Sequence, residues 1–164
     1  MSTKRSHANS RAVAFLRISV GVLFLIFAQY KVFGSTFTHG GGFEMWIHRF
    51  LQDGSAYPFM VPVLQDVVLP HATVIATFVA YSELALGLSL VLGIFVRAAS
   101  IGGVVYMLTL LFSANYPGHD APLWEYFGAS LEHLVFALCF VAFMLGNPSD
   151  MWSLQAAVRR RRRY

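Results

Sequence analysis

The chain has 164 residues and a formal net charge of +4 at pH 7; apolar types make up 57% of it and charged types 12%. A soluble domain carries about 25% charged residues, so this composition excludes a soluble fold, and the apolar content excludes intrinsic disorder. The single cysteine, Cys139, excludes an intramolecular disulfide, a CxxC redox pair and a cysteine-clustered metal centre. A single integral membrane domain in a lipid bilayer is the interpretation that remains.

The first predicted element is a membrane-spanning helix over residues 12–33, close to the length of about 20 apolar residues that a crossing needs. We interpret it as a retained helix and not as a signal peptide, because Arg17 lies inside it and no small-residue cleavage site follows. Helical spacing places one stripe of residues on a single face, with a basic residue near each end: Arg17, Gly21, Phe24, Ala28 and Lys31.

The outer loop over residues 34–71 is too long for a simple hairpin and contains a predicted helix of its own. After the glycines at 40–42, apolar residues recur at helical spacing: Phe43, Trp46, Ile47, Phe50 and Leu51. This pattern is typical of a short amphipathic helix at the outer membrane interface, and a protein-binding patch is the alternative. The apolar stretch between Pro58 and Pro70 is too short and too interrupted to span, so we expect it against the outer mouth of the bundle.

The second and third predicted spans cover residues 72–96 and 98–114. Glu83 lies in the middle of the second span and shares its face with small residues: Ala76, Ala80 and Gly87. Small residues let helix backbones approach closely, so we expect this face to contact another helix and not lipid. The third span has a comparable small-residue surface, made of Ala98, Ala99, Gly102 and Gly103.

The fourth predicted span covers residues 127–146 and carries Glu132 and His133. His133 shares a stripe with two small residues, Ala129 and Ala137. A basic tail over residues 147–164 follows the span. The predicted fold is therefore an all-α, integral membrane four-helix bundle with a short interfacial amphipathic helix in the first outer loop.

Basic residues gather in three places, which four crossings put on one side of the membrane: Lys4 to Arg17, Arg97 between the second and third spans, and Arg159 to Arg163. Cytoplasmic segments accumulate Lys and Arg, so we predict that both termini are cytoplasmic. The arginine run follows a membrane helix directly, and we expect it to meet anionic lipid headgroups and not nucleic acid.

Ionisable residues inside a bilayer cost roughly 2.5–3.5 kcal/mol each and therefore usually have partners. Counted by depth, Lys31 lies level with Glu132 and His133, so we predict that Lys31 pairs with Glu132. Glu83 lies deeper, where Lys31 from one side or Arg17 from the other reaches it; without either partner we expect it to stay protonated.

Arg17 and Arg97 are predicted to be structural ion-pair residues, with Arg17 extending toward the cytoplasmic interface as a snorkelling anchor. Tyr30, Tyr81 and Tyr106 are interpreted as packing aromatics. The outer-side histidines match no metal-ligand spacing, and the chain has no haem, flavin or nucleotide motif, so neither a metal nor a tightly bound cofactor is expected.

The second span reads Tyr81-Ser-Glu-Leu-Ala-Leu-Gly-Leu88 and is followed by Leu92-Gly93 and Arg97-Ala98-Ala99. Together with Leu16-Arg17, Gly21, Lys31 and the closing segment from Gly146 to Leu154, these residues resemble the DoxX family of small four-helix membrane proteins. Two positions depart from the family pattern: Ala28, where glycine is common, and Gln155, where an acidic residue is frequent.

The resemblance implies a protein of a bacterial-type plasma membrane that is linked to redox metabolism. Some DoxX relatives are subunits of a thiosulfate:quinone oxidoreductase, whose small subunit this chain resembles, and others are partners in oxidative-stress complexes. The resemblance therefore implies a chain that is not catalytic alone and that assembles with other membrane subunits or with copies of itself.

Three functions stay open at this point. The first is a quinone-associated subunit of a membrane oxidoreductase, in which Lys31, Glu132 and His133 bind the quinone and Glu83 relays protons. The second is a non-catalytic structural or assembly subunit, in which the buried charges specify helix pairing. The third is a small-solute or proton pathway, which four helices would provide only as an oligomer.

Overall fold

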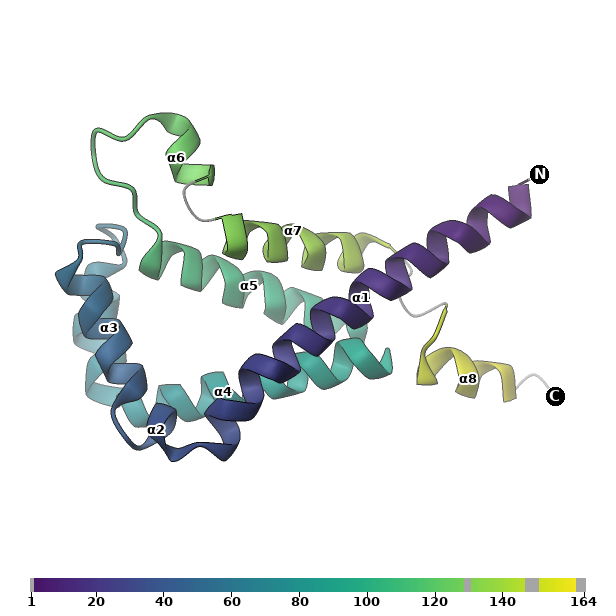
Figure 1. The fold of residues 1–164 in the computed structure, drawn as a ribbon, viewed down its shortest axis with the longest axis horizontal. Helices are drawn as coiled ribbons and strands as arrows, with labels where there is room; N and C mark the ends of the chain where they lie inside the picture. The colour runs from purple at the N-terminus through teal and green to yellow at the C-terminus, as the bar shows by residue number, and fades with distance from the viewer. Residues whose placement is uncertain (1, 129–130, 147–150, 162–164) are drawn as a thin grey trace.

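The computed structural model describes residues 2–128, 131–146 and 151–161, and within these ranges every regular element is helical (Figure 1). Ala129 and the parts of the predicted tail at 147–150 and 162–164 lie outside the described residues. The elements are α1 (Ser2–Phe33), α2 (Ser35–Thr38), α3 (Gly42–Gln52), η1 (Val63–Val68), η2 (Leu69–His71), α4 (Ala72–Leu92), α5 (Val96–Ala114), α6 (Leu123–Gly128), α7 (Leu131–Leu145) and α8 (Leu154–Arg161).

Three helical runs are long and apolar enough to cross a membrane: Asn9–Phe33, Val63–Leu92 and Val96–Ala114. Within the predicted fourth span the described residues form α7, an apolar helix of 15 residues, so a fourth crossing stays a prediction. The second span is longer than expected, since the stretch between Pro58 and Pro70 forms η1 and continues into α4. At the other end of α4, Gly93 adopts a left-handed conformation (φ 69°), which ends the helix before residue 96.

The long helices are arranged as two pairs, α1 with α4 and α5 with α7. The predicted stripe of α1 is confirmed as its buried face: Arg17, Gly21, Phe24 and Ala28 are buried, and Lys31 is half-buried. The small-residue face of α4 is confirmed as well. Gly21 lies against Leu90 and Val91, and Gly87 lies against Leu25, so close that neither has room for a Cβ atom.

The second pair meets the first through aromatic side chains. Phe24 of α1 makes edge-on contacts with Phe136 and Phe140 of α7. Gly103 of α5 also packs on Phe140, and a Cβ atom there would lie 2.5 Å from the ring. The predicted small-residue surface of α5 is therefore divided: Gly103 faces α7, whereas Ala98, Ala99 and Gly102 line a cavity on the side of α4.

Substitution of Gly87 tests the close approach of α1 and α4. We expect Gly87→Leu to destabilise the protein by about 1–3 kcal/mol, because a Cβ atom would lie 2.8 Å from the Leu25 side chain. Denaturation in mixed micelles followed by circular dichroism measures the change. Gly102→Ala is the matched control, since the nearest atom to a Cβ there is 4.0 Å away; equal losses in the two variants would contradict the packing described.

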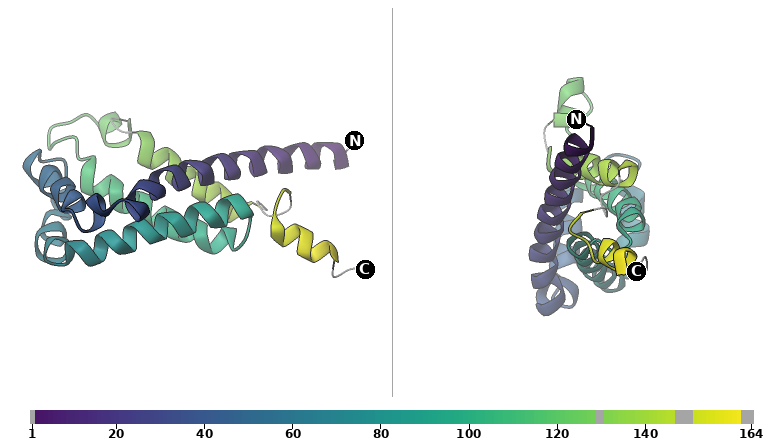
Figure 2. Two further views of the ribbon diagram at one scale, coloured as in Figure 1. Left: turned by 60° about the horizontal axis from the view of Figure 1, so that its bottom comes forward. Right: turned by 90° about the vertical axis from the view of Figure 1, so that its right-hand side faces the viewer.

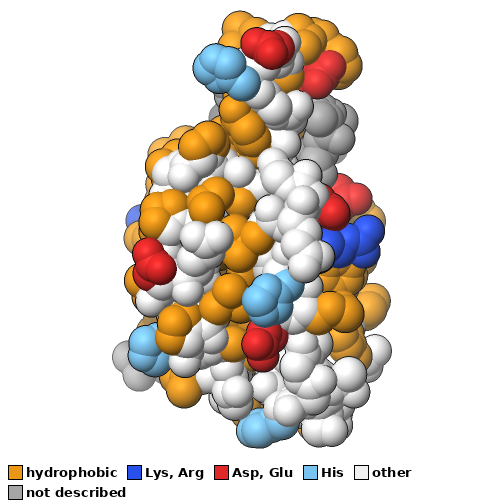
Figure 3. All heavy atoms as spheres, turned by 90° about the vertical axis from the view of Figure 1, so that its left-hand side faces the viewer, with side chains coloured by type: hydrophobic (Ala, Val, Ile, Leu, Met, Phe, Trp, Pro, Cys, Tyr) orange, Lys and Arg blue, Asp and Glu red, His pale blue; other side chains and the backbone are white. Residues whose placement is uncertain are grey.

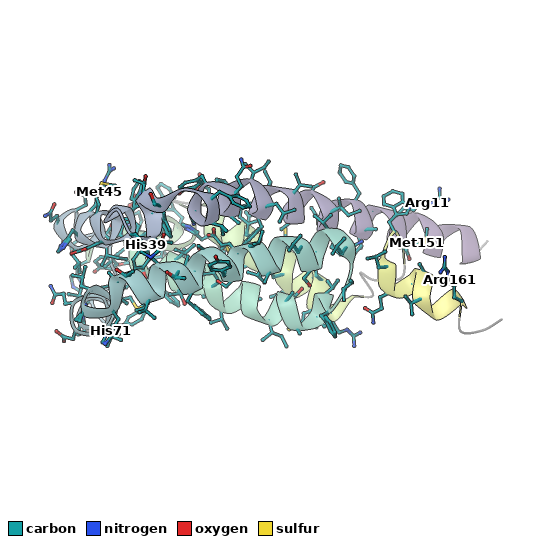
Figure 4. All side chains as sticks on the ribbon, turned by 90° about the horizontal axis from the view of Figure 1, so that it is seen from below. Arg11, His39, Met45, His71, Met151 and Arg161 are labelled. Carbon is teal, nitrogen blue, oxygen red and sulfur yellow. The ribbon has the colours of Figure 1, made fainter. Side chains whose placement is uncertain are left out.

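The two ends of the molecule differ in charge. Both termini lie at the same end (Figures 1 and 2), where Arg11 and Arg161 also lie, opposite His39 and His71 (Figure 4). The opposite end displays acidic and histidine side chains among apolar ones (Figure 3). In each helix pair, α1 with α4 and α5 with α7, the first helix runs away from the end that holds the termini. The second helix runs back to that end.

The outer loop is folded over the end opposite the termini. A helix is present where the apolar residues after the glycines at 40–42 predict one. This helix, α3, begins at Gly42, directly after Gly41, which adopts a left-handed conformation (φ 76°). Ile47 of α3 is buried together with Ala56 and with Leu64 of η1. This small core holds α3 and η1 beside the start of α4.

Candidate functional site

Three helices each contribute one polar side chain to a cluster in the middle of the bundle. Lys31 lies in the last turn of α1, and its Nζ lies 2.6 Å from Oε1 of Glu83 in the middle of α4. Tyr106, in the middle of α5, donates its hydroxyl hydrogen to the same carboxylate oxygen. We call Lys31, Glu83 and Tyr106 the polar cluster.

The carboxylate of the cluster is buried and only partly satisfied. Glu83 is 5% exposed, and its second oxygen, Oε2, has no hydrogen-bond partner among the described residues. A buried charge is tolerated when it is paired and hydrogen-bonded, which the Lys31 ammonium and the Tyr106 hydroxyl provide at Oε1. Oε2 is left with spare acceptor capacity.

The Lys31 ammonium also has spare capacity. It carries three N–H donors, of which Glu83 accepts one. A second side of the ammonium lies over the ring of Phe37 in α2, 4.8 Å from the centroid, a favourable cation–π contact. The structure thus fixes Lys31 in place while leaving a donor for a further acceptor.

The cluster lies at the wall of an apolar cavity of about 1110 Å³ that is open at the molecular surface and is lined by residues of α1, α2, α3, η1, α4 and α5. Lys31 and Tyr106 line this cavity. Among the other polar lining residues, Ser82, Ser89 and Thr109 donate their hydroxyl hydrogens to nearby backbone carbonyls. Lys31 and Tyr106 are therefore lining residues whose polar atoms also bond to a buried carboxylate.

Glu132 and His133 are not part of this cluster. Glu132 is exposed on α7, and the Nδ1–H of His133 donates to Oδ1 of Asn115 at 2.7 Å. The predicted pairing of Lys31 with Glu132 is wrong, because Lys31 forms its ion pair with Glu83 and the Glu132 side chain is exposed. Of the two predicted partners for Glu83, the structure selects Lys31.

Arg17 is buried and does not extend to the interface as predicted. Its side chain is 0% exposed, and it donates to the carbonyl of Leu90 in the last turn of α4 and to that of Trp152 at 2.8 Å. The last carbonyls of a helix have no partner within the helix, so a buried guanidinium there caps α4. Among the described residues its partners are carbonyl oxygens and not carboxylates, which differs from the predicted ion pair.

Glycine at position 93 makes room for this arrangement. A Cβ atom there would lie 2.3 Å from Cβ of Ser153 and 2.9 Å from Nη1 of Arg17. Arg17 thereby joins α1, the end of α4 and the segment that leads into α8. The other predicted structural arginine, Arg97, donates to the carbonyl of Gly146 at 3.5 Å.

Tyr106 is the functional candidate that the sequence interpretation missed, because it was assigned to packing. A hydroxyl in the middle of a span is itself a signal, since it needs a hydrogen-bond partner in a dry environment. Among the described residues, no group of three or more His, Cys, Asp or Glu is arranged to hold a metal ion.

Apolar helices of membrane-spanning length, packed through small residues around buried charges, define an integral membrane protein of the helical-bundle type. The family model for DoxX matches residues 12–115, and the chain belongs to the DoxX family. The matched range includes Arg17, the polar cluster and the cavity-lining faces of α4 and α5, and it ends before α7. No curated protein and no solved structure matches the chain.

Proposed function

We propose that this protein is a redox-associated membrane subunit that binds a quinone and supplies protons to it within a larger oxidoreductase complex. The observation that carries the proposal is a buried, incompletely satisfied Lys–Glu–Tyr cluster at the wall of a large apolar cavity. Ligand pockets typically combine an apolar lining with a few polar groups that fix orientation, and a quinone presents an apolar ring with carbonyl acceptors.

Each member of the cluster has a distinct role in the proposal. The spare donor of Lys31 binds a quinone carbonyl. Glu83 takes up a proton on its unpartnered oxygen, Oε2, and passes it to the quinone, and Tyr106 orients the carboxylate by donating to Oε1. A quinone takes up two electrons and two protons to become a quinol, so the cluster supplies protons while an electron-carrying partner protein supplies the electrons.

The proposed setting follows from the charge distribution. The basic end, with both termini, faces the cytoplasm of a bacterial-type plasma membrane, and α3 lies at the opposite interface. Partner subunits or further copies of the chain complete the complex. The arginine-rich tail contacts anionic headgroups at the cytoplasmic surface.

Quinone binding is testable by fluorescence. Trp46 lines the cavity, and in a Trp124→Phe/Trp152→Phe background it is the only tryptophan of the chain. We expect a benzoquinone added to this protein in nanodiscs to quench Trp46 saturably. Tyr106→Phe is expected to weaken the binding about tenfold, because the Glu83 carboxylate then lacks a hydrogen bond worth roughly 1.5–3 kcal/mol and competes with the quinone for the donors of Lys31.

The control is Tyr81→Phe, which removes a hydroxyl from the exposed face of α4, outside the cavity, and is expected to leave the affinity unchanged. Absence of saturable quenching in the parent protein would overturn the proposal. It would favour the alternative, a structural or assembly subunit, for which the joining of α1, α4 and α5 by the cluster is the supporting observation. In that case Glu83→Gln would reduce the yield of complex and leave turnover per assembled complex unchanged.

A further inference from the structure

Measured along α1, the polar cluster lies much closer to one end of the molecule than to the other. We call the end that carries α3 the α3 end, and the end that holds both termini the terminal end. Lys31 is two residues from the end of α1 at Phe33, after which the chain enters the mostly polar residues 35–39. In the opposite direction α1 continues for fourteen residues, about 21 Å, before it reaches Arg17.

A dry apolar core separates the cluster from the terminal end. Between Glu83 and Arg17, the side chains that α1 and α4 bury are all apolar: Val20, Phe24, Ala28, Leu86 and Leu90. Gly21 lies against Leu90, and Gly87 lies against Leu25, so closely that neither glycine has room for a Cβ atom. A gap that excludes a methyl group also excludes a water molecule, which requires polar partners in addition. Water therefore does not reach Glu83 between these two helices.

The described polar groups on the terminal side do not form a continuous hydrogen-bonded chain to Glu83. Ser89 of α4 and Ser100 of α5 donate their hydroxyl hydrogens to the backbone carbonyls of Ile94 and Val96. The guanidinium of Arg17 donates to carbonyls at the end of α4, and an arginine does not give up its proton in proteins.

The open cavity does not provide a second route from the terminal end. Between the cluster and the turn that joins α4 to α5, its lining is apolar apart from Ser89, whose hydroxyl is bonded to Ile94. An apolar space without polar partners stays free of water. The terminal side of the cluster is therefore sealed on both faces of α4.

Toward the α3 end, Lys31 lies between the buried carboxylate and the surface. Its side chain is 12% exposed, against 6% for Glu83. Tyr30, the preceding residue, also lines the cavity and is more than half exposed. Lysine side chains near the end of a membrane helix reach interfacial water. Lys31 therefore contacts Glu83 with one donor and has access to the α3 end with another.

From this asymmetry we infer that the polar cluster exchanges protons with the aqueous phase at the α3 end only, and that they pass through Lys31. The inference rests on the proposed function and deepens it, because it names the side of the membrane from which Glu83 obtains its proton. In one transfer the Lys31 ammonium releases a proton to the Glu83 carboxylate, and the neutral amine takes up another from the phase at the α3 end. With the predicted orientation, this phase is the outer one.

The groups that influence the protonation of Glu83 are few. Three titratable side chains lie within electrostatic reach of it: Tyr30, Lys31 and Tyr106. The other elements packed against α4 contribute none that is buried, because α2 has no titratable residue and those of α3 and η2 are exposed: Glu44, His48, Arg49 and His71. The pH on the side from which protons arrive therefore governs the protonated fraction of Glu83.

Dicyclohexylcarbodiimide tests the inference, because this apolar reagent enters the bilayer and modifies only protonated carboxyl groups. The full chain is reconstituted in vesicles whose impermeant buffers set the pH separately on each side. External trypsin, which removes the arginine-rich tail when the terminal end faces outward, establishes the orientation. We expect labelling of Glu83, measured by mass spectrometry, to slow by up to about tenfold for each unit of pH added at the α3 end, since the protonated fraction falls by that factor. The same change at the terminal end is expected to leave the rate unchanged.

Arg11→Glu is the matched control. It places a carboxyl group at an exposed position of α1 near the terminal end (Figure 4), and labelling of this group is expected to follow the pH of the terminal end. Glu83→Gln identifies the labelled peptide, because it removes the carboxyl group that reacts.

A labelling rate of Glu83 that follows the pH of the terminal end would overturn the inference. A rate that follows the pH on both sides would also overturn it and would favour a proton pathway through the chain. Absence of labelling at every pH would do the same, because Glu83 would then exchange protons with neither phase. No quinone is present in these measurements, so the proposed function fails separately, when a quinone does not quench Trp46 saturably.

Discussion

Replacing Lys31 by methionine is expected to destabilise the protein by about 3–5 kcal/mol, because it leaves Glu83 buried without its counter-charge. Replacing both partners, in Lys31→Met/Glu83→Leu, is expected to recover most of this loss, since a well-packed apolar pair is often as stable as a buried ion pair. Unfolding in mixed micelles, followed by circular dichroism, gives the free energies for the cycle.

The matched control is a second ion pair of the same chain. Arg49 in the last turn of α3 and Asp53, the residue after this helix, are 3.3 Å apart, but their side chains are 63% and 60% exposed. Solvent-exposed pairs contribute roughly 0–1 kcal/mol, so Arg49→Met is expected to have little effect. A loss for Lys31→Met no larger than that for Arg49→Met would mean that the Lys31–Glu83 pair is not buried in the bilayer.

Arg17→Met is expected to have the second large effect, a loss of about 3 kcal/mol. The substitution leaves the carbonyls of Leu90 and Trp152 without their donor, and each unsatisfied buried polar group costs roughly 1–3 kcal/mol. It also detaches the segment before α8 from α4. We therefore expect faster cleavage of the arginine-rich tail by trypsin.

The rate of tail cleavage and the free energy of unfolding are measured together. Arg11→Met is the control, because Arg11 is exposed on the same helix, less than two turns before Arg17. Arg17→Lys retains the charge but not the planar fork of donors and is expected to lie between the two. Unchanged cleavage in Arg17→Met would show that the tail is held by other contacts.

Much of the architecture was predictable because helical periodicity assigns each residue to a face. The spacing from Arg17 to Lys31 predicted the buried stripe of α1, and the small residues around Glu83 predicted the face of α4 that meets it. Both predictions need only the geometry of one helix, and both are confirmed.

Contacts between helices were harder to predict, because depth counting does not tell which helices are neighbours. Depth alone predicts Glu132 as the partner of Lys31, but α7 packs on α5. Glu83 is the actual partner since α4 lies directly against α1. Tyr106 was missed for a related reason: its role appears only when α5 is placed beside Glu83.

The hydrogen bonds of Arg17 could not be predicted from its own helix, because they join it to residues far away in the sequence. Its hydrogen-bond partners lie at the end of α4 and beyond α7, and local spacing contains no information about either. Gly93 gave a local signal for a helix end, but the reason that its Cβ position must be empty is Ser153, sixty residues later.

Photolabelling with a quinone that carries its reactive group on the ring tests the proposed quinone site most directly. The proposed site requires the label on peptides containing Lys31, Glu83 or Tyr106, with protection by excess unmodified quinone. Label concentrated at the start of α7, around Glu132 and His133, or spread over the lipid-facing surface without protection, would contradict a quinone site at the polar cluster.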